Sequence, residues 1–71
     1  MSARDALRRD KLLDAAVALV LRSGVRRTSI DDIARDAGIS KGAVYLEFSS
    51  KAALLDAAVR REFSRYLAQT C

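Results

Sequence analysis

The sequence predicts a small all-helical fold, and three observations lead to that prediction. The 71 residues contain no proline and only three glycines, so little interrupts a helix. Apolar residues recur at the spacing that gives a helix one apolar face. Serines and glycines that suit helix ends divide the chain into four segments. A chain of this length forms one domain at most.

The first predicted helix runs from about Arg4 to Ser23. Ser2 is its expected N-cap, and Gly24 is its expected end because glycine readily takes the left-handed conformation that closes a helix. Helical spacing predicts an apolar face made of Leu12, Leu13, Ala16, Val17 and Val20.

The second predicted helix covers Ile30 to Ala37, between an N-cap at Ser29 and a stop at Gly38. Acidic residues in its first turn suit the positive end of the helix dipole. The third runs from Lys41 to Phe48, with Ser40 as N-cap. The fourth begins after Ser50 and shows no stop signal. Its periodic apolar residues are Leu54, Leu55, Ala58, Val59, Phe63, Tyr66 and Leu67.

Residues 30–48 are the informative stretch. Two short helices joined by a three-residue turn with a glycine are typical of a helix-turn-helix. Ala34 is small where the helices would cross, and we expect Ile33, Ile39 and Val44 to form the small core of the unit. The second helix of such a unit, residues 41–48 here, enters the DNA major groove with its N-terminal end.

That N-terminal end carries residues that suit a phosphate backbone. Ser40 offers a hydroxyl, Lys41 a cation, and the first helical turn free N–H groups and a positive dipole end. Gly42 and Ala43 have almost no side chain, so the backbone can approach DNA closely. Tyr45 adds a phenol one turn later.

Composition agrees with a polyanionic partner. Thirteen basic residues against nine acidic residues give a formal net charge of +4. There is no histidine, and Cys71 is the single cysteine, so we expect no internal disulfide, metal site, cofactor or catalytic centre. The longest apolar run, Ala15 to Leu21, is far below the roughly 20 residues that span a bilayer.

Several motifs together resemble the N-terminal domain of TetR-family transcriptional regulators. The match extends from about Leu12 to Leu55. Its motifs are Leu12-Leu13-Asp14-Ala15-Ala16, Gly24, Thr28-Ser29-Ile30-Asp31-Asp32-Ile33-Ala34, Ala37-Gly38-Ile39-Ser40-Lys41-Gly42-Ala43-Val44-Tyr45, Phe48, Lys51 and Leu54.

The resemblance implies a three-helix, homeodomain-like head over residues 1–49, with its helix-turn-helix at 30–48. It implies that residues 50–71 form a fourth helix leading to a ligand-binding domain outside these 71 residues. It also implies a cytoplasmic regulator, usually a repressor, that binds a palindromic operator as a homodimer and responds to a small molecule. Carried over by position, the candidate phosphate contacts are Thr28, Ser29, Ser40, Lys41, Tyr45 and Lys51, and Gly42, Ala43 and Leu46 approach bases.

Two departures from the family pattern raise questions. Glu47 stands where the family often has histidine or an aromatic residue, and a carboxylate there repels phosphates unless Lys51 neutralises it or it accepts from a cytosine amino group. Val20 and Val25 replace aromatic residues, which predicts a lighter core.

Other readings remain open at this point. Phe48 is expected in the core, and Tyr45 either in the core or with its hydroxyl at a phosphate. Arg26 and Arg27 face DNA or solvent. The arginines of the fourth helix, Arg60, Arg61 and Arg65, are expected in solvent. The alternative function is a basic helical module that docks an acidic protein partner.

Overall fold

The computed structural model describes the backbone of residues 3–70 and the side chains of residues 6–69, and over this range the chain forms four helices without strands. The predicted all-helical class and helix order are confirmed. The expected N-cap Ser2 and the terminal Cys71 lie outside the described residues. The helices are α1, Ala3–Ser23; α2, Ile30–Ala37; α3, Lys41–Glu47; and α4, Lys51–Thr70.

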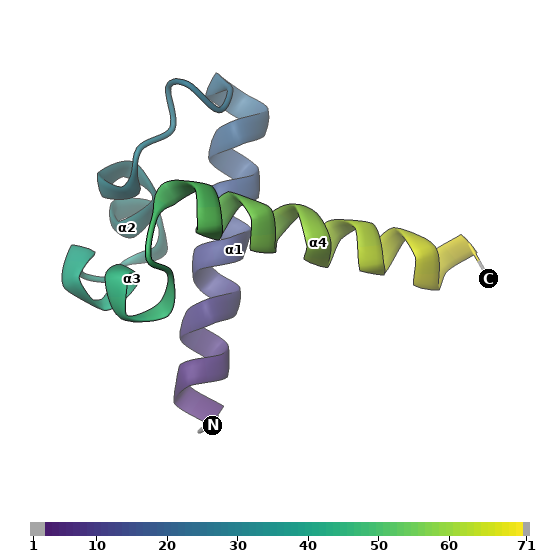
Figure 1. The fold of residues 1–71 in the computed structure, drawn as a ribbon, viewed down its shortest axis with the longest axis horizontal. Coiled ribbons are helices and arrows are strands. Elements are labelled where there is room, and N and C mark those ends of the chain that lie inside the picture. The colour runs from purple at the N-terminus through teal and green to yellow at the C-terminus, as the bar shows by residue number, and fades with distance from the viewer. Residues whose placement is uncertain (1–2, 71) are drawn as a thin grey trace.

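The two long helices, α1 and α4, cross each other, and the two short helices pack beside the crossing. α4 crosses α1 at a steep angle, and α2 and α3 lie together on one side of the crossing (Figure 1). The C-terminal half of α4 extends away on the other side. α1 packs against both α2 and α4, and α2 packs against α3. α1 therefore holds α2 in place, and α2 in turn supports α3.

Each helix contributes at least one fully buried side chain to a single core, the largest being Leu12 from α1, Ile33 from α2, Val44 from α3 and Leu54 from α4. Phe48 is also buried, as predicted. The remaining buried apolar residues are Leu13, Ala15, Ala16, Leu19, Ile30, Ala34 and Ala58. Ala15 and Ala16 of α1 and Ala58 of α4 are thus part of the core that joins the two long helices.

Serine side chains cap the starts of three helices. Asp32 N–H donates to Ser29 Oγ (3.1 Å), and Ser29 N–H donates back to Asp32 Oδ2 (3.3 Å), which completes a capping box. Ala43 N–H donates to Ser40 Oγ (3.2 Å) at α3. The Ser50 hydroxyl caps α4 in the same way. These caps satisfy amide groups that a helix leaves without partners and fix where each helix begins.

Candidate DNA-binding surface

The turn between α2 and α3 has the geometry that the sequence predicts. Gly38 takes the left-handed conformation at φ +72°, and its N–H donates to backbone oxygens of the last turn of α2. Ile39 N–H then donates to Ala34 O (2.9 Å). The chain reverses here, and half-buried Ile39 packs beside the buried Ile33 and Val44. The expected small core of the helix-turn-helix is confirmed.

The reversal leaves the N-terminal end of α3 at the surface. Ser40, Lys41 and Gly42 are exposed and Ala43 is half-buried. Ser40 Oγ accepts the capping hydrogen bond from the Ala43 N–H, so the hydroxyl hydrogen of Ser40 can still donate to a phosphate. The first amide groups of α3 have no acceptor within the helix and point outward along its axis.

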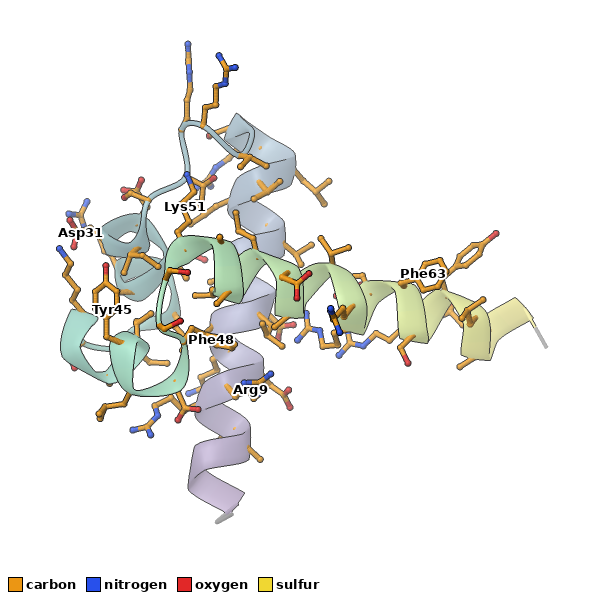
Figure 2. All side chains as sticks on the ribbon, viewed as in Figure 1. Arg9, Asp31, Tyr45, Phe48, Lys51 and Phe63 are labelled. Carbon is orange, nitrogen blue, oxygen red and sulfur yellow. The ribbon has the colours of Figure 1, made fainter. Side chains whose placement is uncertain are left out.

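Two larger side chains continue this surface along α3. Tyr45 is 48% exposed, and Leu46 is 79% exposed. Asp31 and Tyr45 lie on the outer side of α2 and α3, far from Phe63 on α4 (Figure 2). An exposed leucine beside a basic helix end can contact the apolar edge of a base, such as the thymine methyl group. About half of Tyr45 is thus covered by the protein, and the rest is open to a partner.

An ion pair joins the starts of α2 and α3. Lys41 Nζ lies 3.2 Å from Asp31 Oδ1, and both side chains are more than half exposed. The two helix N-termini are therefore adjacent, which places the exposed Ser29 cap on the same side as Lys41. An exposed pair of this kind contributes little stability and exchanges partners easily.

Thr28 has a different role from the expected phosphate contact. Its side chain is 2% exposed, and its hydroxyl donates to Gly24 O (2.8 Å). Its N–H donates to Val25 O (3.2 Å). Both donors of Thr28 are therefore used to shape the loop between α1 and α2. The buried hydroxyl is not available to DNA in this arrangement.

Lys51 reaches the same loop from α4. Its Nζ donates to Val25 O (2.7 Å), and the side chain spans from the start of α4 to the α1–α2 connection (Figure 2). An ammonium group has three donors, so this contact leaves two for other acceptors. Lys51 is therefore a loop tether that can still meet a phosphate.

Glu47 is neutralised by Arg8 of α1, whereas Lys51, one of the two possibilities raised by the sequence, bonds the Val25 carbonyl instead. Arg8 Nη2 lies 2.7 Å from Glu47 Oε1, and Arg8 Nε donates to the same oxygen at 3.1 Å. The Glu47 side chain is only 14% exposed. The next arginine, Arg9, lies over the Phe48 ring with its guanidinium carbon 4.6 Å from the ring centre. Sequence periodicity gives no signal for these pairs because the partners are about 40 residues apart.

Arg61 also differs from its expected place in solvent. It is 16% exposed at the crossing of α1 and α4, where Nη2 lies 2.8 Å from both Asp14 Oδ1 and Glu62 Oε1. Burial alone would lower the pKa of Arg61, but hydrogen bonds to Glu62 and Asp14 outweigh it, so the pKa is raised. Arg60 and Arg65 are exposed, as expected.

Two hollows lie outside the helix-turn-helix surface. An apolar groove of about 450 Å³ runs between α1 and α4. Val20 and Val25 line it, so these two valines open a groove where the sequence predicted only a lighter core. A polar hollow of about 470 Å³ lies between α1 and α2 and is lined by Arg22, Arg27 and Arg35 among others.

None of the helices in residues 3–70 has the length and apolar character needed to cross a membrane. Within the same range, no three histidine, cysteine, aspartate or glutamate side chains gather in a group that could hold a metal ion.

The fold and the surface together define a helix-turn-helix domain. Its α3 presents a basic N-terminal end that no bulky side chain blocks. Residues 12–58 match the family described as bacterial regulatory proteins, tetR family. The chain belongs to the TetR family.

Three curated relatives illustrate the similarity. The chain is 44% identical over 48 residues to the HTH-type transcriptional regulator YvdT of Bacillus subtilis, which is 68% of this chain and 25% of that protein. It is 43% identical over 53 residues to the HTH-type transcriptional repressor KstR2 of Rhodococcus jostii, covering 75% and 26%. It is 41% identical over 49 residues to the HTH-type transcriptional regulator SrpR of Pseudomonas putida, covering 69% and 23%. The matched segment thus spans about a quarter of each relative.

Proposed function

We propose that this chain binds double-stranded DNA with α3 in the major groove and thereby regulates transcription. The observation that carries the proposal is the exposed N-terminal end of α3, where a hydroxyl, a cation and free amide groups meet residues too small to block a close approach. The net charge of +4 supports it. The names of the relatives, which describe transcriptional regulators of the same helix-turn-helix type, support it further.

The proposed contacts divide by chemistry. Phosphate contacts come from the basic and hydroxyl side chains at the starts of α2, α3 and α4 and from one phenol on α3. Base contacts come from α3 itself, where small residues let the backbone approach the bases closely and an exposed leucine projects toward them. The phosphate set is Ser29, Ser40, Lys41, Tyr45 and Lys51, and the base set is Gly42, Ala43 and Leu46. Arg26 and Arg27, which are exposed in the α1–α2 loop, can extend the phosphate set.

The wider role follows from the family. We infer that the regulator is a repressor, since KstR2 is named as a repressor, and we propose that it acts in the cytoplasm. We also propose that α4 leads from the head to a domain that dimerises on a palindromic operator and binds a small-molecule effector. Exposed apolar side chains on the outer part of α4, Val59, Phe63, Tyr66 and Leu67, support a covering partner there.

The test is fluorescence anisotropy of a labelled mixed-sequence duplex titrated with the chain at several salt concentrations. Each cationic phosphate contact contributes a slope of roughly −0.9 in log K against log salt. Lys41→Ala should flatten the slope by about one such unit. Arg60→Ala, which removes an exposed cation from α4, should leave the slope unchanged. Absence of binding, or equal slopes for both variants, would favour the alternative of a module that docks an acidic protein.

A further inference from the structure

A carboxylate on the proposed recognition helix is drawn away from the DNA side. Glu47 follows Val44 by three residues, so the two side chains share one side of α3. Val44 is fully buried, and Glu47 is nearly so. A carboxylate in such a place requires a counter-charge, because burial of an unpaired charge is strongly unfavourable. Arg8 supplies it through two nitrogens on one oxygen.

The same segment of α1 contacts the end of α3 a second time. Arg9 lies over Phe48, the residue that caps α3. A helix of seven residues cannot maintain its own shape or direction, since isolated helices that short are unstable in water. The Gly38 turn fixes the first end of α3. The two arginines fix the other end against α1.

We propose that Arg8 is a positioning residue for DNA binding, which rests on the proposed function. It holds the C-terminal end of α3 against α1 and cancels the negative charge of Glu47. Without Arg8, the carboxylate has to reach water to be solvated, and the open side of α3 is the side proposed to face phosphates. Glu47 then repels DNA and α3 loses its orientation.

A double-mutant cycle separates this role from a simple change in net charge. The variants are Arg8→Ala, Glu47→Gln and the pair, with Lys11→Ala, alone and with Glu47→Gln, as the matched control. Lys11 is an exposed cation on the same helix. Affinity is measured by anisotropy on one mixed-sequence duplex, with thermal melts of every variant.

Arg8→Ala should weaken DNA binding by about tenfold, and Lys11→Ala by about twofold, a typical effect of one screened surface charge. Glu47→Gln should restore most of the affinity in the Arg8→Ala background. In the parent chain and in the Lys11→Ala background it should change the affinity by less than about twofold. Coupled residues in contact show such non-additivity. Equal effects of Glu47→Gln in all three backgrounds would overturn the proposal.

A second variant covers the case in which Arg8→Ala does not fold. Arg8→Lys keeps the charge but replaces two guanidinium donors on Oε1 with one ammonium. It should weaken binding about threefold at constant net charge; an affinity equal to that of the parent would contradict the positioning role. A parent chain that fails to bind duplex DNA would overturn the proposed function and this inference together. A parent that binds without Arg8–Glu47 coupling would overturn the inference alone.

Discussion

Gly38 and Gly42 lie four residues apart and differ in backbone conformation, so the same substitution at each should have opposite effects on stability. Gly38 has φ +72°, whereas Gly42 lies in the first turn of α3 and has no positive φ. A Cβ added at either position meets nothing within 4 Å. Packing clashes are therefore absent from both, and only the backbone preference remains.

The magnitudes follow from that preference. An alanine held in the left-handed conformation costs roughly 1–2 kcal/mol. An alanine in place of a helical glycine stabilises by roughly 0.5–1 kcal/mol. Gly38→Ala should thus lower the free energy of unfolding by about 1–2 kcal/mol, and Gly42→Ala should raise it by up to about 1 kcal/mol. In a domain of this size, each kcal/mol shifts the melting temperature by roughly 4–8 °C.

Urea denaturation of the parent and both variants measures the difference directly. DNA affinity provides a second, independent reading, because Gly42 is proposed to lie close to a base. Gly42→Ala should therefore weaken DNA binding although it stabilises the fold. The reasoning would be refuted if Gly38→Ala were as stable as Gly42→Ala, since the left-handed turn would then carry no conformational requirement.

Three further predictions concern charge. Asp31→Asn, which frees Lys41 and removes a negative charge at the proposed surface, should tighten binding to mixed-sequence DNA about threefold. Asp36→Asn serves as the control, because Asp36 lines the hollow between α1 and α2; equal gains would count against the assigned surface. Arg61→Ala should destabilise the protein by about 1–2 kcal/mol in thermal melts, because it removes contacts at the α1–α4 crossing. Replacing the exposed Arg60 with alanine should change stability by less than about 0.5 kcal/mol. Similar losses for the two variants would contradict a structural role for Arg61 at the crossing. Because the pKa of Arg61 is raised, the stability that its positive charge contributes is retained at neutral pH and is lost only as pH rises through that value, far above neutrality. With no histidine in the chain, DNA affinity should stay constant between about pH 6 and 7.5, and a clear titration in that window would disprove this.

Local signals in the sequence predicted the helices and the turn well. Ser29, Ser40, Gly24 and Gly38 act through bonds to neighbours within five residues, so their roles can be read from adjacent positions. Helical periodicity likewise identified most of the core, because it records which side of each helix is apolar. Leu46 was assigned to the DNA side by resemblance, and its high exposure agrees with an outward position.

Contacts between distant segments could not be predicted in the same way. Arg61 was expected in solvent and Arg8 was given no role, because their partners lie on other helices and depend on the crossing angles. Periodicity indicates which side of a helix is covered and not which residue covers it. Thr28 shows a further ambiguity, since a hydroxyl next to a helix start can face a phosphate or bond a carbonyl four residues earlier.

The central claim is that α3 and the start of α2 form the surface that meets DNA. Titration of the ¹⁵N-labelled chain with a mixed-sequence duplex, followed by amide chemical shifts, tests it residue by residue. The account predicts the largest shifts at Ser29 and across residues 40–46, with little change along the apolar groove at Val20 and Val59. Shifts concentrated on that groove, with residues 40–46 unaffected, would contradict it.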